Sequence, residues 1–186
     1  MKKLFKLVLW IVLICVLIYG GMTAYKKIEK FIYPTDYADL VNKYAEENDL
    51  DKSLVFAVIK CESGFDKNAV SKIGAKGLMQ LTPETYEWVS SKHGKKVDNS
   101  DELFDPETNI QAGCRLLKRH IKEFKSVKTA LAAYHAGRGV TNKWLKDEKY
   151  SSDGVNLDKI PYSETESYVD KVINTVEKYK TIYNID

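Results

Sequence analysis

A single glutamate, Glu62, stands where an apolar segment ends and a polar loop begins. Residues 54–59 before it are all apolar, so the helix that they predict is buried on most sides. Burial disfavours the ionised carboxylate and raises its pKa, which favours a group that is protonated near neutral pH. Such a group can act as a general acid, for example toward a glycosidic oxygen. On its own, however, a glutamate at a helix C-terminus is more often an ordinary surface residue.

The loop after Glu62 is polar and contains several glycines. It reads "SGFDKNAVSKIGAKGLMQLTP". Gly74 and Gly77 allow tight backbone turns, while Ser71 and Gln80 supply a hydroxyl and an amide that could bind a ligand. No Gly-rich phosphate motif is present, and the three histidines (His93, His120 and His135) lack the spacing of metal ligands. The sequence therefore predicts no cofactor and no metal site.

The distribution of charge argues against a nucleic-acid partner. The chain has 29 basic and 26 acidic residues, and Lys2, Lys3 and Lys6 precede the first apolar run. Without these three lysines the charges balance, whereas a nucleic-acid-binding protein normally has a basic face. The neutral remainder gives no indication of a protein partner.

The first segment predicts a membrane helix. No charged residue occurs from Leu7 to Ala24, which is about 27 Å of helix and close to the thickness of a bilayer's hydrocarbon core. The N-terminal lysines favour a cytoplasmic N-terminus and export of the rest. A cleaved signal peptide is the alternative, but Met22 makes "MTA" a poor cleavage site. We expect a single-pass anchor at residues 1–25, a juxtamembrane stalk at 26–34 and one extracytoplasmic domain at 35–186.

Residues 35–186 predict an all-α domain. Asp36 should cap a helix that runs to about Asn48, and Asp51 should cap the next, which runs to Glu62. Further helices are expected after the Thr-Pro and Asp-Pro starts at Thr82 and Asp105. A short apolar helix should end at Gly137, and Ser163 should cap a last helix. Long loops are expected at 63–76, 93–104 and 146–161. Cys61 and Cys114 could form a disulfide in an exported domain, but the sequence favours two buried thiols.

Four ordered blocks resemble the lytic transglycosylases of the soluble-transglycosylase (SLT) type, which share the goose-type-lysozyme fold. They are "ESGFDKNAVSKIGAKGLMQLTPETY", "LFDPETNIQAGCRLL", "ALAAYHAGRGVTNKW" and "IPYSETESYVDKV". Together they cover almost the whole of the predicted domain. The resemblance implies an all-α, lysozyme-like enzyme that cleaves the β-1,4 bond between N-acetylmuramic acid and N-acetylglucosamine in peptidoglycan glycan strands.

The resemblance also implies the catalytic and binding residues. Glu62 would be the single acid and base, and the C6 hydroxyl of the muramoyl residue would attack C1 to leave a 1,6-anhydro end. The substrate-binding residues that the resemblance implies are Ser71, Met79, Gln80, Tyr134, His135, Glu164 and Tyr168. For Met79 a place in the core is an equal alternative, and for Tyr168 the resemblance implies contact with the catalytic acid.

Two positions depart from the family pattern. His135 stands where the family usually has asparagine, so a bulkier group that can become charged occupies this position. Leu116 stands where a tyrosine is usual, and we expect it to serve in packing.

Two other functions remain open from the sequence alone. A muramidase on the same fold would use water in place of the C6 hydroxyl, and a catalytically silent domain would only bind peptidoglycan. The biological role is open as well: the enzyme could remodel the wall or open it locally for a secretion or conjugation machine.

Overall fold

The computed structural model describes residues 2–185, without the side chains of residues 2, 3, 4, 7, 8 and 12. The chain divides into two units, Met1–Pro34 and Thr35–Asp186. The first unit is a helix, α1 (Lys2–Ile32). Within it, Leu9–Ile32 is long and apolar enough by length and composition to cross a membrane, with a mean hydropathy of 1.7. The same helix thus runs through the expected anchor and on through most of the expected stalk, as far as Ile32.

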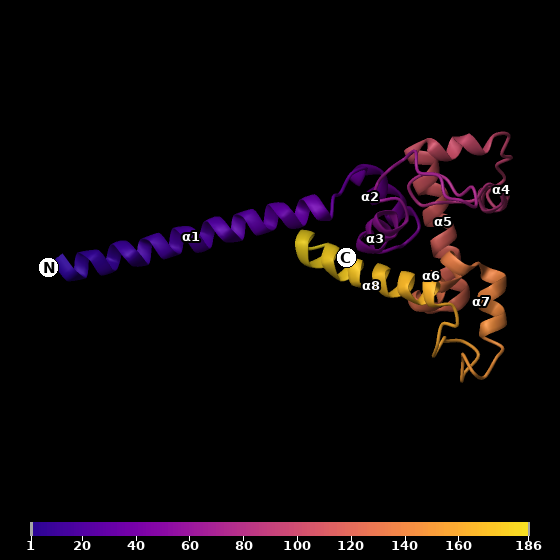
Figure 1. Ribbon diagram of the computed structural model, residues 1–186. Coiled ribbons are helices and arrows are strands. Elements are labelled where there is room, and N and C mark those ends of the chain that lie inside the picture. The colour runs from indigo at the N-terminus through magenta and orange to yellow at the C-terminus, as the bar shows by residue number, and fades with distance from the viewer. Residues whose placement is uncertain (1, 186) are drawn as a thin grey trace. The chain divides into compact units, whose positions relative to one another are not determined.

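The second unit consists of helices and loops (Figure 1). Its elements are α2 (Ala38–Glu47), α3 (Lys52–Glu62), α4 (Pro83–Ser91), the short 3₁₀ helix η1 (Ser100–Phe104), α5 (Pro106–Phe124), α6 (Val127–Ala136), α7 (Arg138–Trp144) and α8 (Ser163–Tyr183). Two isolated β-bridges, in which Lys76 pairs with Val70 and with Leu81, close the loop after α3. Residues 2–185 contain no strand, which confirms the all-α prediction.

Two predicted helix starts are capped as expected. The Thr82 side chain accepts a hydrogen bond from the backbone N–H of Thr85 at the start of α4. The Asp105 side chain accepts from the backbone N–H of Thr108 at the start of α5. In both cases proline follows the cap, where its missing N–H costs nothing because the first N–H groups of a helix have no partner within the helix.

Two other predictions about the helices were wrong in detail. The cap of α2 is Tyr37, in a left-handed conformation with φ 60°, and not Asp36. The cap of α8 is Tyr162 and not Ser163, which is the first helical residue. Helix α7 was not predicted: it starts directly after Gly137, because this glycine ends α6 and also begins α7.

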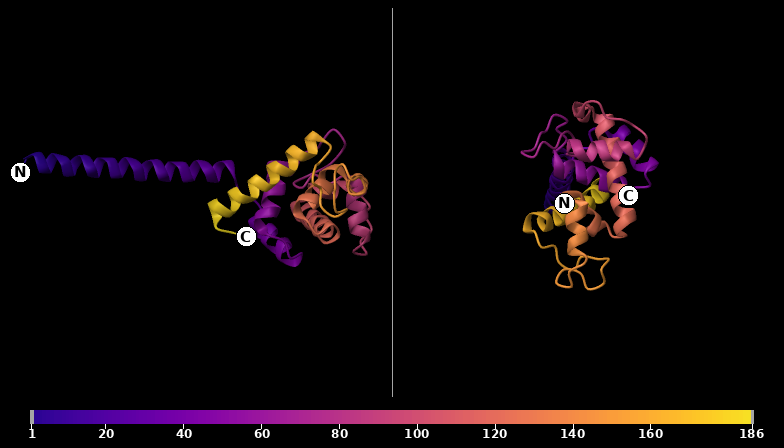
Figure 2. Two further views of the ribbon diagram at one scale, coloured as in Figure 1. Left: turned by 90° about the horizontal axis from the view of Figure 1, so that it is seen from below. Right: turned by 90° about the vertical axis from the view of Figure 1, so that its right-hand side faces the viewer.

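Helix α3 forms the centre of the domain, and residues Ser53–Ile59 are all buried. Helix α8 lies along α3 (Figures 1 and 2), and the ring of Phe56 stacks on that of Tyr179 with the centroids 5.4 Å apart. Full burial of a phenylalanine stabilises the fold by about 2–3 kcal/mol, so this contact fixes α8 against the helix that carries Glu62.

Helix α5 connects the part of the domain that carries α4 with the part that carries α6 and α7 (Figure 1). It packs against α2, α4, η1 and α6. The predicted disulfide alternative is not realised, because Cys61 and Cys114 are both unpaired.

Candidate active site

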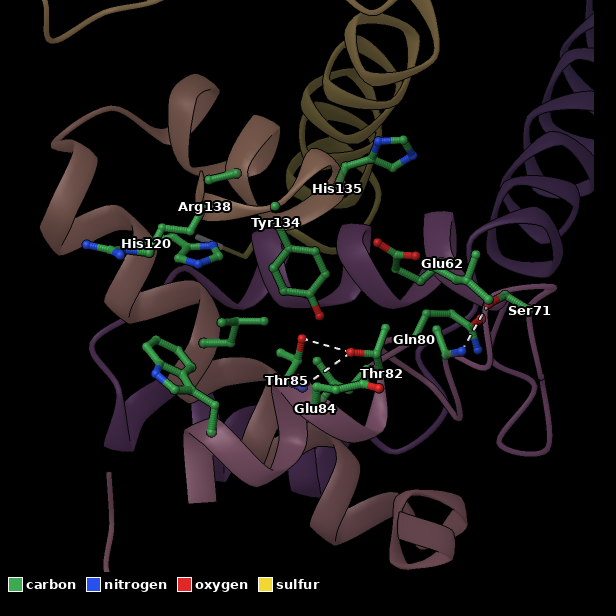
Figure 3. A pocket seen from close by; sticks show the side chains of 17 residues that line it. Glu62, Ser71, Gln80, Thr82, Glu84, Thr85, His120, Tyr134, His135 and Arg138 are labelled. Atoms are coloured by element: carbon green, nitrogen blue, oxygen red, sulfur yellow. Dashed lines mark hydrogen bonds between the residues drawn. The ribbon is translucent and has the colours of Figure 1, made fainter. Parts of the chain in front are cut away.

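Glu62 opens into a cleft with a volume of about 620 Å³. The walls come from the end of α3, the loop that follows it, α4, α5, α6 and the first residue of α7. Four other residues predicted for the site also line this cleft: Ser71, Gln80, Tyr134 and His135. Figure 3 shows Tyr134 near the middle, with Ser71 and Gln80 on one side and His120 and Arg138 on the other.

The surroundings of Glu62 favour its protonated form. Burial at the end of α3 raises the pKa of its carboxyl group to about 7, while a hydrogen bond from Tyr168 and the charge of Lys171 act in the opposite direction. A carboxyl group with this pKa is about half protonated at neutral pH, which suits a group that first donates and then accepts a proton.

Tyr168 holds the carboxyl group of Glu62 in place. Its hydroxyl donates a hydrogen bond of 2.6 Å to Oε1 of Glu62. The side chain is only 8% exposed and is not among the residues that line the cleft. Tyr168 therefore contacts the candidate acid from behind and leaves the second carboxyl oxygen for a substrate.

His135 lies against the outer side of this pair. Its ring stacks on Tyr168 with the centroids 4.5 Å apart and an interplanar angle of 27°, and its Nδ1 lies 3.0 Å from Oγ1 of Thr165. Partial burial lowers the pKa of His135, and the charge of Glu164 opposes this effect. The histidine that replaces the family's usual asparagine is thus a packing partner of Tyr168 as well as part of the cleft rim.

Glu164 is not brought into the cleft that contains Glu62. It is exposed and lines a second, shallower pocket with His135, Pro161 and Tyr162. A contact between Glu164 and the sugars at the candidate acid is therefore not part of the arrangement that the structure shows.

The Met79 side chain also departs from the predicted site. It is fully buried and packs against Gly113 of α5, so it belongs to the core, which was the alternative. Its carbonyl oxygen, in contrast, accepts a hydrogen bond of 2.7 Å from the Tyr134 hydroxyl. The backbone of Met79 thus fixes the Tyr134 ring that divides the cleft.

The polar residues of the loop are engaged in its internal structure. The Ser71 hydroxyl accepts a hydrogen bond from the backbone N–H of Ala75 at 3.0 Å. The Gln80 side-chain Nε2 donates to the carbonyl oxygens of Ala69 and Gly77 at 3.1 and 2.9 Å. Both residues still line the cleft, and the described bonds leave the Ser71 hydroxyl proton and Oε1 of Gln80 for a ligand.

Ser63, directly after the candidate acid, ties α3 to this loop. Its hydroxyl donates to the carbonyl oxygen of Leu78 at 2.9 Å and accepts from the backbone N–H of Phe65 at 3.1 Å. The Glu-Ser pair therefore combines the acid with the side chain that fixes the loop beside it.

Asn109 of α5 holds the other end of the loop. It is fully buried, and its Oδ1 accepts a hydrogen bond from the Met79 backbone N–H at 2.8 Å. Its Nδ2 donates to the carbonyl oxygens of Lys76 and Leu103 at 2.9 and 2.8 Å. One buried amide thereby bonds to three backbone groups, of which the Lys76 carbonyl oxygen also accepts a hydrogen bond from the Leu81 N–H at 3.2 Å.

Several lining residues were not predicted from the sequence. They are Ile73, Ala75, Leu81, Thr82, Glu84, Thr85, Trp88, His120, Ala133, Gly137 and Arg138. His120 lies four residues after Leu116 on the same face of α5. Arg138, in contrast, follows Gly137 on a different helix from Tyr134, so helical spacing does not relate the two. Leu116 packs in the core as expected, and it lines the cleft as well.

Within residues 2–185 there is no group of three or more histidine, cysteine, aspartate or glutamate side chains that could hold a metal ion.

Comparison with known proteins identifies the family. The model of the transglycosylase SLT domain matches residues 39–156. The chain belongs to the transglycosylase SLT family. It is 32% identical over 149 residues to the soluble lytic murein transglycosylase of Escherichia coli K12, a match that covers 76% of this chain and 22% of that protein. Against membrane-bound lytic murein transglycosylase C of Edwardsiella ictaluri the identity is 29% over 170 residues, covering 78% and 47% of the two chains.

Solved structures confirm the SLT fold. An inactive mutant of the lytic transglycosylase Slt from Pseudomonas aeruginosa, with glutamine in place of a glutamate, superposes with a TM-score of 0.72 at 32% identity and covers 82% of this chain. A 70-kDa soluble lytic transglycosylase in complex with bulgecin A gives a TM-score of 0.73 at 27% identity. This SLT chain spans 25% of the length of each.

We expect the hydroxyl of Tyr168 to lower the pKa of Glu62 in this SLT domain. In Tyr168→Phe the ionised carboxylate loses a hydrogen-bond donor, so the pKa of Glu62 should rise above about 7, by about 1. NMR titration of the Glu62 carboxyl carbon measures this change. The control is Tyr134→Phe, whose hydroxyl bonds to Met79 and not to Glu62. An unchanged or lower pKa in Tyr168→Phe would contradict the assigned role.

Proposed function

We propose that the chain is a peptidoglycan lytic transglycosylase that cleaves the β-1,4 bond between N-acetylmuramic acid and N-acetylglucosamine. The observation that carries this proposal is the carboxyl group of Glu62 in an open cleft, with a pKa raised by burial to about 7. The names of the relatives, which are lytic murein transglycosylases, support the same substrate.

The reaction divides into two proton transfers. Glu62 first donates its proton to the glycosidic oxygen, and the bond to C1 of the muramoyl residue breaks. The resulting carboxylate, which accepts the hydrogen bond from Tyr168, then takes the proton of the C6 hydroxyl as that oxygen bonds to C1. The product is a 1,6-anhydromuramoyl end, and no water is consumed. Because the nucleophile belongs to the substrate, it is already held close to C1.

The alternative is hydrolysis by a water molecule on the same fold. Inverting hydrolysis needs a second carboxylate as a base, and among the described lining residues Glu84 is the other acid. Glu84 is exposed and lies beside Thr82 and Thr85 on the wall formed by the start of α4 (Figure 3). The single buried carboxyl group favours the transglycosylase reaction.

We also propose that α1 anchors the domain in the cytoplasmic membrane, with the N-terminus in the cytoplasm and the SLT domain outside. The support is the apolar helix Leu9–Ile32 together with the lysines that precede it. From this position the enzyme would act on the nearest glycan, either in remodelling the wall or in opening it for a secretion or conjugation machine.

Product analysis tests the proposed function. We expect the full chain in mild detergent to release muropeptides that are about 18 Da lighter than the hydrolysed products, because internal capture by the C6 hydroxyl omits one water. Mass spectrometry of the digest measures this difference. Residues 35–186 should give the same products, since α1 serves only to localise the enzyme. Reducing ends would show a muramidase, and the absence of any cleavage would favour a binding domain.

A further inference from the structure

The charge of the domain is unevenly distributed along the chain. Residues 108–146, which form most of α5 together with α6 and α7, contain nine lysines and arginines and a single acid, Glu123. The other residues of Thr35–Asp186 comprise 14 basic and 24 acidic ones. The near-neutral total of the domain therefore combines a basic part with an acidic part.

The outer face of α5 carries a dense group of these positive charges. Arg115, Lys118, Arg119 and Lys122 recur at intervals of three and four residues, so they lie on one face of the helix. None of the four is buried, and they extend over about 10 Å of the helix axis. We call these four residues the basic stripe.

The basic stripe lies on a different face of α5 from the cleft. Leu116 and His120 line the cleft, and at about 100° per residue they point roughly a quarter-turn or more around the helix from the centre of the stripe. Glu123 also lies off the stripe and pairs with Arg138 of α7. A ligand on the basic stripe would therefore leave the glycan cleft free.

The charge of the stripe is not neutralised by the part of the chain that the structure describes. Lys118 pairs with Asp49 at 2.8 Å, whereas no described acid forms an ion pair with Arg115, Arg119 or Lys122. Like charges at this spacing destabilise a helix, and attraction to the helix C-terminus offsets this only in the last turn, which contains Lys122. A bound polyanion would turn this unfavourable pattern into a favourable one.

The surroundings of the stripe distinguish between classes of polyanion. Between residues 74 and 126, all of them described, no large hydrophobic side chain is exposed, so the stripe lacks the apolar side chains that insert into a lipid surface. Single-stranded nucleic acid is bound by aromatic rings that stack on its bases, but the Arg119 guanidinium covers the Trp88 ring at 4.7 Å from its centroid. A linear polyanion without acyl chains or bases fits this surface best.

We propose that the basic stripe of α5 is a docking surface for a linear polymer with phosphodiester charges and no bases, of the polyol-phosphate class found in cell walls. Such a chain can place successive phosphates beside successive turns of α5, where guanidinium and ammonium groups donate charge-assisted hydrogen bonds. The extracytoplasmic position proposed above would bring the domain to this polymer. Docking holds the domain at the wall while the cleft stays open to glycan.

The test measures binding of fluorescently labelled poly(glycerol phosphate) to the full chain in mild detergent, by anisotropy at several salt concentrations. Arg115→Gln combined with Lys122→Gln should weaken binding about tenfold and lower the slope of log Kd against log salt by about 1. The matched control, Lys67→Gln combined with Lys178→Gln, removes two exposed lysines elsewhere and should bind like the unmodified protein. Both double variants lose two positive charges, so net charge alone does not explain a difference.

Competition decides the class of partner. Single-stranded DNA with the same number of phosphates, and phosphatidylglycerol added to the detergent micelles, should each compete more weakly than unlabelled poly(glycerol phosphate). The absence of polymer binding, an equal loss in the two double variants, or equal competition by DNA or by the lipid would overturn the proposal. Binding of the polymer needs no glycan cleavage, so this result is independent of whether the proposed enzymatic function holds.

Discussion

Replacing Glu62 by glutamine should lower the rate of glycan cleavage by about 10²–10⁴-fold, the usual contribution of a positioned general acid and base. Glutamine keeps the size of the side chain and can still accept the hydrogen bond from Tyr168 at its amide oxygen, but it cannot give a proton to the glycosidic oxygen. The rate of appearance of anhydromuropeptides, measured by liquid chromatography and mass spectrometry, provides the comparison. Glu84→Gln is the matched control, since it removes the other carboxyl group that lines the cleft and should leave the rate within a few-fold.

The same substitution should stabilise the fold at alkaline pH. The pKa of Glu62 is raised in the folded state, from 4.5 to about 7, so the unfolded chain loses this proton at lower pH than the folded chain does. The contribution of Glu62 to the free energy of unfolding is therefore highest below about pH 4.5 and falls as the pH rises to about 7. At pH 8, Glu62→Gln should be more stable by on the order of 3 kcal/mol.

Chemical denaturation at pH 4 and pH 8 measures this difference. The gain should disappear at pH 4, where the carboxyl group is protonated in both states. Cleavage of glycan at the normal rate by Glu62→Gln would show that Glu62 is not the acid. The same relative stability at both pH values would show that its carboxyl group does not have a pKa raised by burial.

Gly77→Ala should destabilise the domain by at least about 3 kcal/mol, which combines overpacking with the cost of a left-handed alanine. Gly77 has φ +73°, and a Cβ there would lie 2.2 Å from the Leu103 backbone carbonyl oxygen and 2.2 Å from Nδ2 of Asn109. The backbone cannot move aside without breaking the hydrogen bonds of Asn109 to the loop. We expect the variant to lose both stability and the shape of the cleft, measured by denaturation and by sugar binding.

Gly94→Ala separates the effect of overpacking from the effect of the left-handed backbone conformation. Gly94 has a similar φ of +71°, but a Cβ there would meet nothing within 4 Å. This variant should lose only about 1 kcal/mol, the cost of the conformation alone. Equal losses in the two variants would show that the contact with Asn109 and Leu103 does not limit the fold.

The sequence predicted the parts of the site that depend on local patterns. The apolar run before Glu62 indicated a buried helix, and α3 is buried along Ser53–Ile59. The Thr-Pro and Asp-Pro starts at Thr82 and Asp105 were predicted from capping chemistry, which is decided within a few residues. Ser71, Gln80, Tyr134 and His135 were predicted by resemblance to the family, and the cleft brings them together with Glu62. Their contacts with substrate remain predictions.

The features of the fold and of the site that were not predicted depend on contacts between distant parts of the chain. The sequence could not show that Met79 points into the core, because an apolar residue within a polar loop fits either environment. It could not place His120 and Arg138 at one end of the cleft, since they come from different helices whose crossing is set by packing. Helix α7 was missed because Gly137, with φ 91°, serves two helices at once.

The contact between Tyr168 and Glu62 joins residues 106 positions apart. The other elements of the cleft precede Ser163, whereas Tyr168 arrives on α8, which also covers the helix that carries the acid. A ribosome releases the chain from its N-terminus, so Glu62 is made long before the helix that carries its hydrogen-bond donor. Until α8 has docked on α3, Glu62 lacks the hydrogen bond from Tyr168. The environment that sets the pKa of Glu62 is therefore complete only after the last helix of the domain has folded.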